Sequence, residues 1–90
     1  MRVTVHYMAQ MKRLAGCASE PVEIHVGSCL SDLLVHVAGR HGDAFRAILL
    51  DEAAVPRKSL LYFVGEEHAE LTRPLNDGDA VTLLAPMAGG

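Results

Sequence analysis

Apolar and polar residues alternate at the start of the chain, where Val3, Val5 and Tyr7 are separated by polar side chains. A period of two residues is typical of a strand that buries one face. Good helix formers follow at 8–15, and Gly16 stands where a helix commonly ends with a glycine. The N-terminal segment therefore predicts a strand followed by a short helix.

A second strand is predicted to begin at Pro21 and to end at Gly27. Its apolar face would consist of Val22, Ile24 and Val26, which alternate with polar residues. Because the first two strands are nearly adjacent in sequence, they can pair antiparallel.

The main helix is expected next. Ser28 can cap its N-terminus, and Asp32 in the first turn suits the positive end of the helix. The apolar stripe has helical spacing and consists of Cys29, Leu30, Leu33, Leu34 and Val37. Asp43 is expected to begin a further helical turn.

The second half of the chain predicts a loop and three strands. The polar segment 51–58 is expected to be a surface loop. The continuous apolar run 60–64 predicts a strand buried on both faces, and 68–71 predicts a short edge strand. The segment Asn76–Asp79 is a strong turn signal before the last strand, 80–85.

One main helix needs one apolar sheet face to cover. The last strand is the most apolar of the late elements, so we expect it to lie centrally beside the first strand. The pattern therefore predicts a single α+β domain over 1–90, a β-grasp with a mixed sheet of four or five strands packed on one main helix.

Composition limits the function classes. The chain has two cysteines, too few for a disulfide scaffold or a four-cysteine metal site, and neither an export signal nor a membrane span is recognised, so we expect a cytoplasmic protein. A net charge of −3 argues against nucleic acid as a partner. Acidic residues predominate in 51–90, which suggests docking onto a basic surface or, equally well, a solvated acidic face.

The side chains give little sign of a catalytic or metal site. The five histidines lie on different predicted elements without metal-ligand spacing and are interpreted as surface or boundary residues. Cys17 is expected to be an exposed thiol in a turn, and Cys29 a small core residue. No Ser–His–Asp or Cys–His pairing and no phosphate-binding loop is found. We expect no metal site.

The last residues differ from the rest. Pro86 should end the sheet, and Ala88, Gly89 and Gly90 offer almost no side chain to pack. We expect 86–90 to be a flexible tail that reaches at most roughly 16 Å when extended. Its carboxylate would be the one conspicuous reactive group, although glycines also collect at termini that simply fray.

Three segments resemble the MoaD/ThiS family of ubiquitin-like sulfur carriers. They are the alternating strand 3–7, the helix that starts at Ser28 with Asp-Leu-Leu at 32–34, and the ending Pro-Leu-Asn-Asp-Gly-Asp-Ala-Val-Thr-Leu-Leu-Ala-Pro-Met-Ala-Gly-Gly at 74–90. The resemblance implies that the carboxylate of Gly90 is the working group. A partner related to the ubiquitin-activating enzymes would adenylate it with ATP and Mg²⁺, and sulfur from a persulfide donor would then give a thiocarboxylate. The carrier itself would bind no cofactor and would not be an enzyme.

The tail and its root are the predicted binding site. The small residues Ala88 and Gly89 would let the carbonyl enter active sites on other proteins. Pro86 is a further predicted binding residue. Around the root of the tail we expect an apolar docking patch made by Leu84 and Met87 with Tyr62 or Phe63. The alternative is that Leu83 and Phe63 are simply core residues.

The resemblance favours the small subunit of a molybdopterin synthase, whose catalytic residues would lie on the large subunit. The sulfur could instead serve thiamine, cysteine or secondary-metabolite synthesis. Two further classes stay open: a ubiquitin-like modifier, in which Gly90 forms an isopeptide bond with a lysine, and a β-grasp interaction module with an inert tail.

Overall fold

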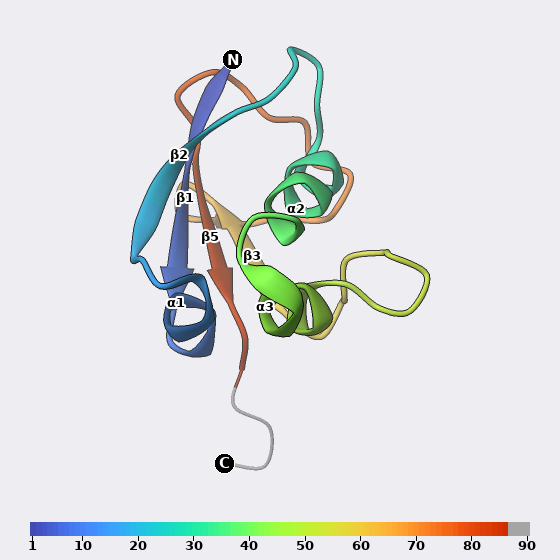
Figure 1. The fold of residues 1–90 in the computed structure, drawn as a ribbon. Helices are drawn as coiled ribbons and strands as arrows, with labels where there is room; N and C mark the ends of the chain where they lie inside the picture. The colour runs from blue at the N-terminus through green and yellow to red at the C-terminus, as the bar shows by residue number, and fades with distance from the viewer. Residues whose placement is uncertain (87–90) are drawn as a thin grey trace.

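The computed structural model describes residues 1–86, which form one five-stranded sheet and three helices (Figure 1). In chain order the elements are β1 (Arg2–Met8), α1 (Gln10–Ala15), β2 (Ser19–Glu23), α2 (Leu30–Ala38), α3 (Gly42–Leu49), β3 (Leu61–Val64), β4 (Glu67–His68) and β5 (Ala80–Leu84). The strand order is β2-β1-β5-β3-β4, in which β1 and β5 are parallel and the other pairs antiparallel. The predicted β-grasp with a central last strand is therefore confirmed.

The core lies between the helices and one face of the sheet. Alternate residues of β1 point into it, so that Val3, Val5 and Tyr7 are at most 1% exposed. The helices contribute apolar residues that are fully buried, among them Leu30, Leu33, Leu34, Val37, Phe45 and Leu49. Amphipathic periodicity thus decided which face of β1 and of α2 is covered.

Two predictions about the first half are wrong in detail. β2 ends at Glu23, and Val26 is 85% exposed, because β1 begins at Arg2 and offers no partner to residues beyond Ile24. The N-cap of α2 is Cys29, which is half-buried, and its backbone N–H donates to the carboxylate of Asp32 at 3.0 Å. Asp32 in the first turn therefore works as predicted, while Ser28 lies one residue outside the helix.

Four further predictions need correction. β3 is not buried on both faces: Tyr62 and Val64 are buried, but Leu61 and Phe63 are half-buried because none of the described helices covers that face of the sheet. The edge strand spans 67–68 only. Cys17 is not fully exposed, since it is half-buried against the core. The helical turn expected after Asp43 is a complete helix, α3.

The buried Tyr62 hydroxyl makes stability depend on pH. Its O–H donates to the carbonyl of Arg57 at 2.6 Å, and burial raises the pKa of Tyr62 to about 12. Since the unfolded chain gives up this proton near pH 10, the folded state loses stability as the pH rises from about 10 towards 12. We expect the free energy of unfolding to fall by about 1 kcal/mol more between pH 9 and pH 11 in the wild type than in Tyr62→Phe. Urea titrations of both proteins measure this difference, and parallel pH curves would refute it.

Candidate functional site

The chain leaves the sheet at the end of its central strand. β5 lies between β1 and β3 and ends near α1 (Figure 1). Ala85 is still 5% exposed and part of the core, whereas Pro86 is exposed and in no strand. Because proline has no N–H for a sheet ladder, the strand cannot continue through Pro86, and β5 ends at Leu84, one residue before the predicted end. Met87, Ala88, Gly89 and Gly90, on which the predicted reactive tail depends, lie outside the described residues.

The turn before β5 fixes where this strand lies. The carboxylate of Asp77 accepts the backbone N–H of Arg2 at 2.7 Å, and the N–H of Gly78 donates to the carbonyl of Arg2 at 2.8 Å. Gly78 has φ of 87°, a conformation that side chains with a Cβ rarely adopt. The Asp-Gly pair thus joins the start of β5 to the start of β1, and the parallel register from Thr4–Ala80 to Met8–Leu84 follows.

Four apolar side chains meet on the uncovered face of the sheet beside the end of β5; we call Met8, Leu61, Phe63 and Leu84 the open-face patch. Leu84 lies opposite Met8 on one side and opposite Leu61 on the other. Phe63 is one diagonal step away, opposite Thr82, and its ring packs edge-on against the ring of His68 with centroids 5.8 Å apart. Met8 is 49% exposed and the others are half-buried, so the patch leaves apolar area open to solvent.

The predicted patch residues divide between two faces. Leu84 and Phe63 lie on the open face, whereas Tyr62 and Leu83 belong to the core. The alternative that Leu83 is core is correct, and the same alternative for Phe63 is wrong. Sequence reasoning missed Met8, although an apolar residue at a polar position of the first alternating strand is a signal that could have found it.

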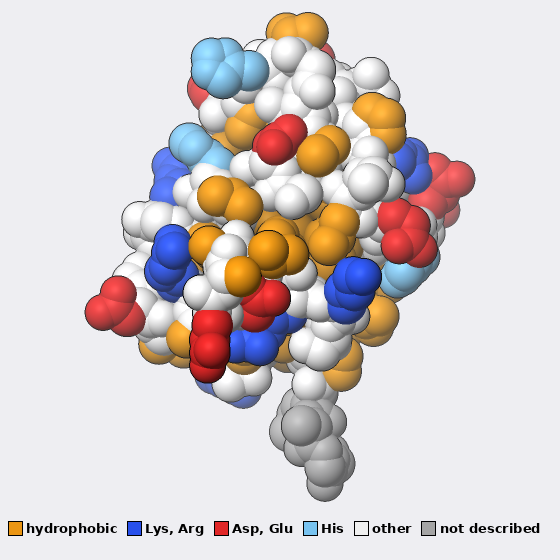
Figure 2. Space-filling view, turned by 90° about the vertical axis from the view of Figure 1, so that its right-hand side faces the viewer, with side chains coloured by type: hydrophobic (Ala, Val, Ile, Leu, Met, Phe, Trp, Pro, Cys, Tyr) orange, Lys and Arg blue, Asp and Glu red, His pale blue; other side chains and the backbone are white. Residues whose placement is uncertain are grey.

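Charges of both signs surround the helical side of the molecule. Figure 2 shows the side on which the 51–58 loop lies, where Lys and Arg alternate with Asp and Glu around hydrophobic side chains. A shallow hollow of about 250 Å³ there is lined in part by the charged residues Asp43, Arg46, Asp51, Glu52 and Arg57. The acidic excess of the second half is therefore not gathered into a one-sign surface on this side.

A second hollow, of about 320 Å³, lies at the root of the tail. It is lined by Gln10, Ala47, Ile48, Arg57, Ser59, Leu60, Ala85 and Pro86. Residues of α1 and α3 therefore line this hollow together with Ala85 and Pro86. Among residues 1–86, no helix is long and apolar enough to cross a membrane.

A five-stranded mixed sheet with a central parallel pair and helices on one face defines a ubiquitin-like β-grasp protein. The model of the ThiS family matches residues 5–90, and the chain belongs to this family of small ubiquitin-like sulfur carriers. Members of this kind are carrier proteins rather than catalysts.

Solved structures share this fold. SAMP1 from Haloferax volcanii superposes with a TM-score of 0.90 over 100% of both chains at 20% identity. A Pyrococcus furiosus protein assigned as subunit 1 of the molybdopterin converting factor gives a TM-score of 0.79, with 27% identity over 97% of this chain and 99% of the other. The third structure is a complex of subunits 1 and 2 of the molybdopterin-converting factor from Helicobacter pylori 26695. It gives a TM-score of 0.64 at 20% identity, with 100% of each chain covered. This Helicobacter pylori relative thus forms a complex with a partner subunit.

Proposed function

We propose that this protein carries sulfur as a thiocarboxylate on Gly90 and donates it in molybdopterin synthesis, as the small subunit of a two-subunit synthase. The observation that carries the proposal is the family match, which extends through 90 and so includes the Gly-Gly ending. The 27% identity to a Pyrococcus furiosus protein assigned as a molybdopterin converting factor subunit supports this pathway, while thiamine and cysteine synthesis remain alternative destinations for the sulfur.

The proposed chemistry has three balanced steps. An adenylyltransferase uses ATP and Mg²⁺ to join the Gly90 carboxylate to AMP, and pyrophosphate leaves. The outer sulfur of a persulfide donor attacks the activated carbonyl, AMP leaves, and an acyl disulfide forms. A second thiol then cleaves that disulfide, which gives the thiocarboxylate and a disulfide between the donor thiol and the second thiol. A carboxylate becomes a good electrophile only once its oxygen is part of a good leaving group, so activation has to come first.

The partners supply the catalytic groups, and this chain supplies position. The register that joins β1 to β5 fixes the point at which the chain leaves the fold. A fixed departure point restricts where Gly90 can lie in a partner's active site, and correct placement of a reacting group is worth several kcal/mol of barrier. The open-face patch gives the partner apolar surface next to that point.

We expect Leu84→Asp to weaken binding to the adenylyltransferase by roughly 100-fold, because docking would bury an unpaired carboxylate in place of an apolar side chain. The matched control is Thr4→Asp, which places the same charge on the same face of the sheet at the other end of the β1–β5 pair. Titration calorimetry measures both affinities. Wild-type affinity in a folded Leu84→Asp variant would remove the open-face patch from the docking surface.

The direct test of the proposed function is intact mass. The protein is incubated with ATP, Mg²⁺, a cognate adenylyltransferase and a sulfide source, and we expect one oxygen to be replaced by one sulfur. An unchanged mass with a partner that converts another carrier would refute the carrier chemistry.

A ubiquitin-like modifier is the second candidate, favoured by the TM-score of 0.90 to a small archaeal modifier protein. It would use the same adenylate but would end in an isopeptide bond. Blots of lysate from cells that express a tagged protein distinguish the two, because a modifier gives a ladder of conjugates and a carrier gives a single band.

A further inference from the structure

An acidic side chain occupies a core-facing position at the edge of the sheet. Glu20 on β2 pairs with the fully buried Val5, so its side chain points towards the helices, and it is 15% exposed. A carboxylate there is costly unless it is paired and hydrogen-bonded. The side chains that pair with this carboxylate therefore indicate the role of Glu20.

Three groups surround the carboxylate of Glu20. The hydroxyl of Tyr7 donates to Oε2 at 2.6 Å, the Nε2 atom of His41 contacts the same oxygen, and Arg40 lies 3.3 Å from Oε1. Burial alone would raise the pKa of Glu20, but the hydrogen bonds from Tyr7 and His41 outweigh burial and hold this pKa below its usual value. The carboxylate is thus ionised and oriented.

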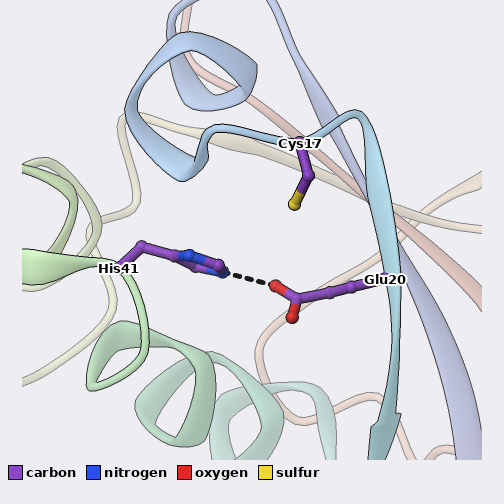
Figure 3. Close-up of side chains that lie close together, drawn as sticks. All are labelled: Cys17, Glu20 and His41. Atoms are coloured by element: carbon purple, nitrogen blue, oxygen red, sulfur yellow. Dashed lines mark hydrogen bonds and ion pairs between the residues drawn. The ribbon is translucent and has the colours of Figure 1, made fainter.

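A thiol and an imidazole complete the cluster. Cys17 follows α1 in a turn, Glu20 lies on β2, and His41 lies between α2 and α3 (Figure 3). One ligand atom from each of the three lies within 4.8 Å of the others. The His41 ring is held edge-on by Tyr7 and by Phe45, with centroids 5.5 Å and 5.0 Å away, and its side chain is 13% exposed. The three ligand types are therefore brought together by the fold, with the imidazole fixed in place.

We propose that Cys17, Glu20 and His41 form a Zn²⁺ site with water in the fourth position. Sulfur, imidazole nitrogen and one carboxylate oxygen are the ligands that Zn²⁺ takes in proteins, whereas Mg²⁺ and Ca²⁺ take oxygen alone. Zinc bonds of about 2.0–2.3 Å place tetrahedral ligands roughly 3.5 Å apart, so small side-chain rotations convert the present cluster into a bound one.

Charge and outer contacts suit the bound state. A thiolate and a carboxylate neutralise the ion, neutral His41 adds no charge, and the thiol proton of Cys17 is released on binding. Tyr7 and Arg40 would remain as hydrogen-bonding partners of the ligating carboxylate, and such outer partners orient metal ligands. The ion would tie the turn after α1 and the edge strand β2 to the α2–α3 junction. The site lies on the helical side of the sheet, away from the open-face patch, and does not depend on the proposed sulfur transfer.

The test is titration of the full-length reduced protein with Zn²⁺ alone. We expect one ion per chain with a micromolar or tighter dissociation constant, and at least tenfold weaker binding in Cys17→Ser and in His41→Gln. The matched controls are Cys29→Ser and His36→Gln, which remove the same groups elsewhere and should bind as the wild type does.

One spectroscopic and one thermal measurement keep the test decisive if a variant folds poorly. Co²⁺ bound to the wild type should give a thiolate charge-transfer band that Cys17→Ser lacks. Zn²⁺ at about a hundred times its dissociation constant should raise the unfolding midpoint of the wild type by on the order of 10 °C. Absence of Zn²⁺ binding, binding that survives both ligand substitutions, or a Co²⁺ complex without the thiolate band would overturn the proposal.

Discussion

Deletion of Gly90 is expected to abolish conversion of the protein to a thiocarboxylate. The remaining carboxylate would belong to Gly89 and would end about 3.5 Å closer to the fold. A displacement of even about 1 Å from the productive position can cost a factor of roughly 100 in rate, so a shift of one residue should lower adenylation below detection. Intact mass measured over time with the adenylyltransferase, ATP, Mg²⁺ and sulfide gives the rate.

Gly90→Ala is the matched control, because it keeps the length of the tail and adds one methyl group beside the carbonyl. We expect it to react more slowly than the wild type but measurably faster than the deletion variant. Both changes lie beyond the described core, so unfolding midpoints should be unchanged. If the deletion variant gains sulfur at the wild-type rate, Gly90 is not the reacting residue and the proposed function is wrong.

The strands could be predicted because burial on one face leaves a direct trace in the sequence. Val3, Val5 and Tyr7 alternate with polar residues, and β1 buries those three side chains. The turn at 76–79 could be predicted because its Asp and Gly requirements are local. The central position of β5 followed from its apolar character. Local chemistry and periodicity together were therefore enough for the fold.

Some features could not be predicted from the sequence, because they depend on where neighbouring strands end and on contacts between distant segments. The true end of β2 is set by the start of β1, so the alternation that continues to Val26 is misleading. The Cys17–Glu20–His41 cluster joins residues with no metal-ligand spacing, and only the tertiary fold brings His41 to the sheet edge. The open-face patch can be recognised only from the register of the strands, which places Met8 and Leu61 on either side of Leu84.

Phe45→Ala is expected to lower the free energy of unfolding by about 3–5 kcal/mol, which is a large loss of stability. Phe45 is fully buried on α3, and its ring packs edge-on against Tyr7 with centroids 5.5 Å apart and an interplanar angle of 88°. It also supports the ring of His41. Removal of the ring leaves a cavity between α3 and β1 and takes away both aromatic contacts. The total free energy of unfolding of a small domain is about 5–15 kcal/mol, so this single truncation should remove a large share of the stability.

Phe45→Leu separates the loss of volume from the loss of the ring. Leucine fills most of the space without aromatic edges, and we expect it to cost about 1–2 kcal/mol. Chemical unfolding of the three proteins gives the ordering, and we expect the midpoint temperature of Phe45→Ala to fall by roughly 15–30 °C. A cost below about 1 kcal/mol for Phe45→Ala would mean that α3 is a dispensable addition to the β-grasp. The expected large cost would mean instead that α3 completes the core and positions His41, which precedes it, towards the sheet. The sequence indicated this helix only as a further helical turn.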